Sequence, residues 1–411
     1  MKLPRRIVLV GTLLTLLGAT SGATAFASGT RDDIPRMFRP HAIFSVIPDP
    51  ANYSDFGKWG AIEKGMIAIG APETQIPPHQ TKSGRGKVFI YRKSRTVASA
   101  IIRHSPALAD GSGFGMSVAV DGSYVVVGAP YASRKVNGQS VQTGMTYVFS
   151  CGGAQPNCNS AAAPLATIPG TTAHAECGYA VAIGGSSSRL AVAVGCRGGN
   201  AVEWRAYLPT AGSWTPVTPL KTLTPPPVTP PTLSCTDFGY SVAMSGWSLA
   251  IGCQAADRAY VYTDVLPGSP TLATTCSNPS STFGYFGDAV AISGSTLLIG
   301  AWQSVPQRAY VVKWTGSPSC STLHALKPSS GAPAFFGNGV AISTAGTLWV
   351  SAAGSNSTGA AYEYKMTGGS WPSLPTSKVG TPGIGNDEIF ASDTTSQVLV
   401  TGYNDHADLI P

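Results

Sequence analysis

Charged side chains are scarce in this 411-residue chain. Asp, Glu, Lys and Arg make up 11% of its residues, whereas they form about 25% of an ordinary soluble domain. This shortage excludes a coiled coil and a charged disordered tail, because both depend on many charged residues. Long apolar runs are also scarce: after the first 27 residues, no second segment of about 20 apolar residues follows. A multi-span membrane protein is therefore excluded as well.

The composition also disfavours helices. The chain contains 48 glycines and 32 prolines, the two residues that weaken a helix most. Its hydrophobic fraction of 43% is too high for a disordered chain, because such chains cannot bury enough apolar surface to fold. The length could hold two or three small domains or one large all-β domain.

Residues 1–27 are predicted to be a cleaved signal peptide. Lys2, Arg5 and Arg6 form a positive start, an apolar run follows from Ile7 to Leu17, and Ala25-Phe26-Ala27 offers small residues for cleavage. The alternative is an uncleaved anchor, although three glycines make the segment a poor spanning helix. We expect a secreted or surface-displayed protein without a further transmembrane segment. The small positive charge left after cleavage gives little reason to expect nucleic-acid binding.

One pattern recurs seven times in the mature chain. Clear copies are GFGMSVAVDGSYVVVGAP at 113–130 and YFGDAVAISGSTLLIGA at 285–301, and the last copy, at 384–403, is degenerate. Each has two short strands around a turn rich in Gly, Ser or Asp, which predicts a β-hairpin. Strands that are apolar at nearly every position are expected to be buried on both faces. The anchor glycines are Gly57, Gly115, Gly178, Gly239, Gly287, Gly337 and Gly385.

A third strand is predicted after most copies, and a more variable fourth segment follows it. The third strands are KVFIY at 87–91, MTYVF at 145–149, RAYVY at 258–262, RAYVV at 308–312 and AAYEY at 360–364. Four strands in each repeat of roughly 55 residues are typical of propeller blades. We therefore predict an all-β fold in which residues 28–411 form a single seven-bladed β-propeller of four-stranded antiparallel blades.

Two segments outside the hairpins are assigned to blades. Residues 37–50 precede the first Phe-Gly without a hairpin of their own, so we predict that they complete the last blade and remove open sheet edges. The Pro- and Thr-rich stretch 209–232 could be a linker between domains. Because it falls inside one repeat interval, we interpret it as an outer loop or edge strand of blade 3.

The run from Phe-Gly through Val-Gly-Ala-Pro to Gly-x-x-Tyr-Val resembles the FG-GAP repeat of integrin α-chains, and the resemblance covers nearly all of the mature chain. It implies a propeller that acts in adhesion or recognition. Many integrin-type repeats carry an Asp-x-Asp-x-Asp-Gly calcium loop in the hairpin. Here each of the six clear hairpin turns has at most one acid, too few oxygen ligands for calcium. We therefore expect the short variant of the repeat, with no metal and no cofactor.

The eight cysteines are expected to form disulfides, because their number is even and the chain is exported. Cys177 replaces the Phe of the third Phe-Gly, and Cys196 replaces the facing Ala. Cys253 holds the same Ala position in the next copy, and Cys235 lies three residues before the Phe that faces it. Cys151 and Cys158 flank a short loop, which leaves Cys276 and Cys320 for each other. No CxxC or Cys/His zinc spacing occurs. The predicted disulfides are Cys151–Cys158, Cys177–Cys196, Cys235–Cys253 and Cys276–Cys320.

No linear catalytic motif is found. The six histidines are scattered, and there is no Gly-x-Ser-x-Gly, P-loop or HExxH sequence. We expect no enzyme and no catalytic residue. The alternative is a propeller hydrolase, which would need acids or histidines that converge near the axis of the ring.

Binding residues are predicted on two long loops, 72–86 and 130–144, which leave the same face of adjacent blades. They carry Lys82, Arg85, Arg134 and Lys135, with Tyr131 between. This basic patch could hold an acidic protein loop, a carboxylated sugar or a sulfated polymer. The alternative is a pair of solvated loops whose charges keep the protein soluble.

Trp302 follows the fifth hairpin and could stack on a sugar or pack between blades. We expect a monomeric, non-catalytic module for extracellular protein or glycan ligands. A multivalent lectin is the first alternative, and it would have several equivalent sites where an integrin-like contact has one.

Overall fold

A computed structural model describes residues 45–48, 56–57, 59–72, 86–92, 98–103, 111–152, 158, 163–210, 213–217, 220–227, 234–264, 270–280, 282–320, 322–329, 334–343, 345–353, 358–382, 386–391, 398–402 and 406–410. The chain divides into two compact units between Met37 and Phe38, and all described residues belong to the second. Within these ranges there is no helix with the length and apolar character needed to span a membrane.

The described chain is all-β, and most of its sheets have four antiparallel strands. Three of these sheets, from the inner strand outward, are β2 (Gly60–Glu63), β3 (Met66–Ala71), β4 (Lys87–Arg92) and β5 (Ala100–Arg103); β6 (Ser117–Asp121), β7 (Tyr124–Ala129), β10 (Met145–Ser150) and β11 (Ala166–Pro169); and β17 (Ser241–Ser245), β18 (Ser248–Cys253), β19 (Arg258–Thr263) and β20 (Thr271–Ser277). In these three sheets the third strands, β4, β10 and β19, are the ones predicted from the sequence. The other two predicted third strands are β23 and β27 of the sheets described next.

Three more sheets have the same form. They are β21 (Val290–Ser293), β22 (Thr296–Ala301), β23 (Arg308–Lys313) and β24 (His324–Leu326); β25 (Phe336–Ile342), β26 (Leu348–Ala352), β27 (Thr358–Tyr364) and β28 (Ser377–Pro382); and β29 (Asn386–Ala391), β30 (Val398–Gly402), β31 (His406–Ile410) and β1 (Ser45–Pro48). The structure is thus a β-propeller with six four-stranded blades.

The third sheet in chain order has five strands instead of the predicted four. It contains β12 (Cys177–Ser186), β13 (Arg189–Cys196), β14 (Ala201–Thr210), β15 (Ser213–Pro216) and β16 (Lys221–Leu223). The ten-residue β14 is long enough to pair with β15 near its end and with β16 near its start. The described part of the Pro- and Thr-rich stretch therefore supplies edge strands.

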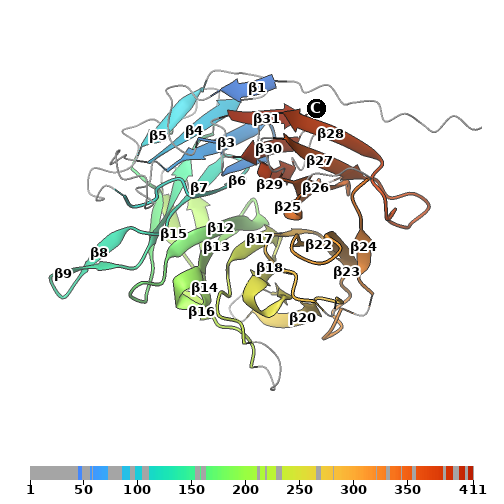
Figure 1. The fold of residues 1–411 in the computed structure, drawn as a ribbon. Coiled ribbons are helices and arrows are strands. Elements are labelled where there is room, and N and C mark those ends of the chain that lie inside the picture. Colours follow the sequence, from blue (N-terminus) through green and yellow to red (C-terminus); the bar gives the residue numbers. More distant parts are fainter. Residues whose placement is uncertain are drawn as a thin grey trace, which may run out of the picture. The chain divides into compact units, whose positions relative to one another are not determined.

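The inner strands place the sheets in a ring. Contacts run in the order β2, β6, β12, β17, β21, β25 and β29, and β29 returns to β2. Figure 1 shows the sheets arranged around a common centre. β1 pairs antiparallel with β31 over Ser45–Pro48, so an early segment is the outer strand of the last sheet. This is the position that the sequence assigns to residues 37–50, whose other members lie outside the described ranges.

Where its side chains are described, the second strand of a hairpin is almost completely buried on both faces. The first strand is less buried than expected, since all five residues of β17 are only partly buried. Val125, Val126 and Val127 on β7 are fully buried, although successive side chains of a strand point to opposite sides. Within a blade, the Phe of Phe-Gly packs on an aromatic ring of the third strand. The pairs are Phe56–Phe89, Phe114–Tyr147, Phe238–Tyr260, Phe286–Tyr310 and Phe336–Tyr362, with ring centroids 5.3–5.7 Å apart.

The glycines of the repeat allow adjacent blades to approach closely. Gly287 has φ 93°, and the peptide N–H of Asp288 donates to the carbonyl oxygen of Tyr285 at 3.0 Å, so Phe-Gly forms the centre of a turn with a positive φ at its second central residue. A Cβ on Gly252 of the preceding blade would lie 2.0 Å from the Gly287 oxygen. The motif is therefore a packing contact between blades.

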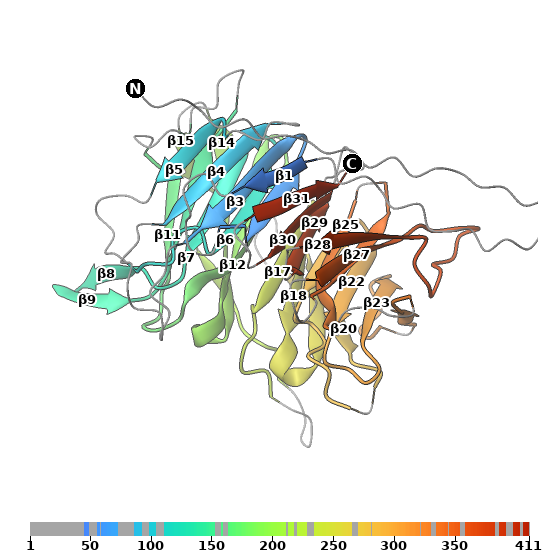
Figure 2. The same ribbon diagram turned by 45° about the horizontal axis from the view of Figure 1, so that its top comes forward.

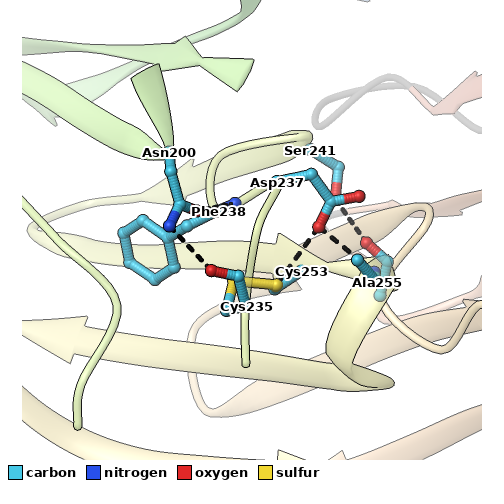
Figure 3. Close-up of a disulfide and its surroundings, with 8 residues drawn as sticks. Asn200, Cys235, Asp237, Phe238, Ser241, Cys253 and Ala255 are labelled. Atoms are coloured by element: carbon cyan, nitrogen blue, oxygen red, sulfur yellow. Dashed lines mark hydrogen bonds between the residues drawn. A yellow bond between two sulfur atoms is a disulfide. The ribbon is translucent and has the colours of Figure 1, made fainter. Parts of the chain in front are cut away.

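The structure contains the same four disulfides that the sequence predicts. Around Cys235–Cys253, Asn200 joins two blades (Figure 3). Its Nδ2 donates to the Cys235 carbonyl oxygen, and its Oδ1 accepts from the Phe238 N–H, both at 2.7 Å. This disulfide thus lies in a hydrogen-bonded junction between the third and fourth sheets.

Candidate functional site

The site is built on the face of the ring where the turns before Phe-Gly and the segments after Gly-Ala emerge, which we call the loop face. The residue before Phe-Gly, or before its Cys-Gly variant, has a positive φ at four described positions: Gly113, Glu176, Tyr285 and Phe335, with φ of 71°, 53°, 53° and 64°. Three of these are not glycine. A left-handed backbone costs a residue with a Cβ about 1–2 kcal/mol, and such strain concentrates at functional sites.

The first group of side chains on the loop face is the Tyr–Arg cluster, formed by Tyr131, Glu176, Tyr179, Arg197 and Tyr240. The Arg197 guanidinium carbon lies 4.8 Å from the centre of the Tyr179 ring and 5.9 Å from that of Tyr240. The two tyrosine rings are 5.3 Å apart. Glu176 approaches the Arg197 Nε only to 4.0 Å. The cluster therefore holds a cation over two neighbouring aromatic rings, with a carboxylate beside it.

Local structure explains these positions. Tyr179 and Tyr240 each follow the glycine of a repeat turn, and their N–H groups donate to the carbonyl oxygens of Glu176 and Asp237 at 3.1 and 3.0 Å. Arg197 begins the 3₁₀ turn η1 (Arg197–Gly199), directly after β13. The turns of two neighbouring sheets thus bring the tyrosines to the same arginine.

Burial and neighbouring charges shift the pKa values in this cluster. Burial raises the pKa of Tyr240, and Asp288 raises it further. Burial also raises the pKa of Tyr131, with Glu176 contributing in the same direction. For Arg197, burial works to lower the pKa, but Tyr179 and Glu176 outweigh it and the pKa is raised. At neutral pH Tyr131 and Tyr240 are therefore neutral and Arg197 is a cation. The Arg197 side chain is 44% exposed.

The second group on this face, which we call the aromatic ladder, consists of Phe283, Tyr285, Trp302 and Phe335. The Tyr285 and Trp302 rings are stacked, 5.3 Å apart and 3° from parallel. Phe283 lies edge-on to Tyr285 at 4.9 Å, and Phe335 lies at 67° to Trp302 at 5.2 Å. The two outer side chains are partly exposed to solvent, Phe283 to 43% and Phe335 to 39%.

The structure brings only some of the predicted binding residues together. Tyr131 lies in the Tyr–Arg cluster, whereas Lys82 and Arg85 lie outside the described ranges. Arg134 and Lys135 are on β8 (Ser133–Val136). This strand pairs with β9 (Gln139–Gln142) in a separate two-stranded sheet, which projects from the larger sheets in both views (Figure 1, Figure 2). The basic patch as a whole remains a prediction.

Two other results concern residues adjacent to the motif. Trp302 packs between Tyr285 and Phe335. Of the two roles considered from the sequence, stacking on a sugar or packing between blades, this arrangement is closer to packing between blades. The sequence reasoning did not select Glu176, Tyr179, Arg197 or Tyr240, because each adjoins a repeat landmark that was used only to mark strands. Alignment of the copies on their glycines carries the missing signal, since Tyr179 and Tyr240 then occupy the same position, directly after the glycine.

The axis of the ring contains a cavity of about 250 Å³. Its lining comes from the inner strands, and every lining side chain from the described residues is Ala, Val, Ile or Met. Two groups of potential metal ligands also occur, Cys177 with Cys196 and Glu203, and Cys235 with Asp237 and Cys253. Both cysteine pairs are disulfides, so neither offers the thiolates that a metal needs.

A sequence model of the FG-GAP repeat matches residues 108–149. This stretch contains the second Phe-Gly turn and the strands β6, β7 and most of β10. A search of curated proteins finds no significant match to the chain. The match covers one repeat. Other described copies share its hairpin, its glycine contacts and, in four cases, its pair of aromatic rings.

Proposed function

From the premise that this chain is an FG-GAP β-propeller, we propose that it is a secreted or surface-displayed binding module with no catalytic role. We further propose that the ring has seven blades, the five-stranded sheet β12–β16 being the third. The closed order of inner-strand contacts supports this count. The disulfides and the signal-like residues 1–27 support an extracellular location.

The Tyr–Arg cluster is the observation that carries the proposal of binding. A guanidinium supported by aromatic faces keeps its N–H donors directed toward an anionic oxygen. Glu176 faces the Nε atom at 4.0 Å, so a ligand carboxylate can approach the two terminal NH₂ groups. The hydroxyl groups of Tyr131, Tyr179 and Tyr240 add donors and acceptors around that position. We propose a protein or glycan ligand that presents a carboxylate to Arg197.

The residues of the loop face favour a single ligand-binding site over several equivalent sites. The residues that follow the motif glycine in the described copies are Met116, Tyr179, Tyr240, Asp288 and Asn338, which differ in size and charge. A multivalent lectin with one pocket between each pair of blades would need similar chemistry at every turn. The axial cavity offers no titratable lining side chain among the described residues, which gives a propeller hydrolase no support at that position.

The test is binding of the mature protein, residues 28–411, to an array of glycans and extracellular matrix proteins, followed by calorimetry on each hit. Arg197→Gln removes the positive charge and the planar guanidinium group with its N–H donors. We expect it to weaken binding of a carboxylated ligand by roughly 10–100-fold, the loss of about 1.5–3 kcal/mol associated with a hydrogen bond to a charged group. The expected stoichiometry is one site per chain.

Arg189→Gln is the matched control, because Arg189 is exposed at the opposite end of the same strand. Arg134→Glu tests the predicted basic patch separately. A ligand that binds Arg197→Gln as tightly as the wild type would remove the cluster as its site. Several sites of equal affinity per chain would favour the lectin.

A further inference from the structure

The aromatic ladder is not part of the hydrophobic core. The core position in each turn belongs to the next residue: Phe286 and Phe336 are fully buried and pack on Tyr310 and Tyr362. Tyr285 and Phe335 precede them and turn outward on a left-handed backbone. Glycine occupies the same position in the second sheet, as Gly113. The ladder thus has large aromatic rings, half-buried Tyr285 and exposed Phe335, at two positions where glycine would relieve the strain.

The ladder has the chemistry of a surface for an uncharged, extended apolar ligand. None of its four side chains carries a charge, and Val305, three residues after Trp302 in the chain, is apolar and 76% exposed. The nearby Asp257 carboxylate is already occupied, since it accepts from the N–H groups of Gly284 and Phe286. Surfaces lined with aromatic rings bind proline-rich segments, because such segments are already extended and lose little entropy on docking.

The chain itself contains such a segment. Residues 222–234, TLTPPPVTPPTLS, include five prolines and no charged residue. The segment begins at β16, where Leu223 pairs with Val202 near the start of β14, and it ends beside Cys235, whose carbonyl oxygen accepts from Asn200 at the loop face. Thr224–Pro227 belong to no strand, and Thr224 and Pro227 are exposed. The described ends of the segment, Thr224–Pro227 and Ser234, therefore lie on the same face as the ladder. Residues 228–233 lie outside the described ranges.

We propose that the aromatic ladder binds the proline-rich segment, residues 224–232, of a second copy of this chain. Because the ladder and both described ends of the segment lie on the loop face, two copies that meet face to face about a two-fold axis can exchange the contact in both directions. The protein is then expected to be a monomer at low concentration and to form a dimer as its concentration rises. This proposal is independent of the ligand site at Arg197.

The first experiment measures binding of a fluorescent peptide of residues 221–234 to the mature protein by anisotropy. Phe335→Gly and Tyr285→Gly each remove one ring and leave a residue suited to the left-handed backbone. We expect each to weaken peptide binding at least about tenfold, as for an aromatic side chain central to an interface. Their melting temperatures should equal or exceed that of the wild type, so lost binding cannot be attributed to unfolding.

Leu374→Ala is the matched control, since Leu374 is a 59% exposed apolar side chain away from the ladder. We expect it to bind the peptide within about twofold of the wild type, and a peptide with serine in place of every proline should not bind. The proposal is overturned if the wild type does not bind the peptide, or if Phe335→Gly binds it equally well.

Sedimentation velocity tests the second copy directly. The wild type should form dimers with rising concentration, and Phe335→Gly should remain monomeric. A variant with Pro225→Ser, Pro226→Ser, Pro227→Ser, Pro230→Ser and Pro231→Ser should also remain monomeric. A mixture of the two variants should regain weak association through the one intact contact, whereas Arg197→Gln should dimerise like the wild type. A ladder that is occupied by the chain's own segment, independent of concentration, would contradict the proposal.

Discussion

At the scale of single residues, Phe-Gly and Gly-Ala are two halves of one contact between neighbouring blades. The Phe closes its own blade by packing on the third strand, and the Gly brings its carbonyl oxygen against the glycine of the preceding blade. A Cβ on Gly252 would approach this oxygen, and a Cβ on Gly287 would lie 2.3 Å from the Arg258 oxygen. The glycines therefore recur because backbone meets backbone, and not because the chain needs flexibility.

Gly287→Ala should destabilise the protein by about 2–3 kcal/mol. The added methyl group meets a carbonyl oxygen, and the alanine must also adopt a positive φ, so overpacking and strain add. Gly294→Ala is the control, because Gly294 also has a positive φ but no atom lies within 4 Å of the place that its added methyl group would take. That change should cost only about 1 kcal/mol. Urea unfolding measures both values, and equal losses would show that the contact does not matter.

Asp237→Asn should stabilise the protein at neutral pH. Burial raises the pKa of Asp237 more than the Ala255 N–H and Arg197 lower it. The folded protein therefore favours the neutral carboxyl group of Asp237. The stability that this preference gives the protein is fully present below the ordinary pKa of 3.8, and it is lost as the pH rises through the raised pKa of the folded state. Asparagine keeps an oxygen for the Ala255 N–H, which Asp237 accepts at 3.1 Å.

Melting temperatures at several pH values check this prediction. The asparagine variant should melt above the wild type at pH 7, and the difference should shrink as the pH falls toward 3.8. A variant that is less stable at pH 7 would mean that attraction to Arg197 outweighs the penalty of burial.

At the scale of elements, the third sheet replaces a pair of rings with a disulfide. Cys177 stands where the other described blades have Phe, and Glu203 stands where they have an aromatic residue on the third strand. Glu203 is 2% exposed, and its Oε1 accepts from both the N–H and the hydroxyl of Thr171. The Cys177–Cys196 bond links β12 to β13, the first and second strands of the sheet. A covalent link and a buried hydrogen-bonded carboxylate thus occupy the place of aromatic packing.

Removing the disulfides one at a time should destabilise the protein in order of loop length. The separations are 7 residues for Cys151–Cys158, 19 for Cys177–Cys196 and 44 for Cys276–Cys320. Loss of loop-closure entropy predicts about 2, 3 and 4 kcal/mol for the paired alanine variants. Urea unfolding with the remaining bonds intact gives the values. If the longest loop showed the smallest loss, native packing rather than chain entropy would govern these bonds.

At the scale of the whole molecule, the ring depends on a segment from the start of the described chain. β1 pairs with β31, four residues with four, as the outer strand of the last sheet. Without it β31 would expose a row of unpaired backbone groups, the kind of edge that promotes aggregation. The ring is therefore completed by strand pairing between segments more than 350 residues apart.

A protein that begins at residue 49 should be less stable than one that begins at residue 44. The four paired residues of β1 contribute about 2–4 kcal/mol if each lost hydrogen bond is worth about 0.5–1 kcal/mol. The shorter protein should also scatter more light after mild heating, because β31 becomes an edge. Equal melting and scattering would show that β1 does not close the ring in solution.

The sequence by itself determined the repeat, the hairpins, the third strands and the cysteine pairs, because these follow from local periodicity and from matching positions in successive copies. It also assigned residues 37–50 to the last blade, where β1 lies. It did not determine the fifth strand of the third sheet, since the pairing of β15 and β16 depends on how far β14 extends. Only the tertiary structure placed Arg197 over Tyr179 and Tyr240, and Trp302 between Tyr285 and Phe335. These residues lie on turns of adjacent blades, and how such turns meet depends on blade packing, which no periodicity along the chain encodes.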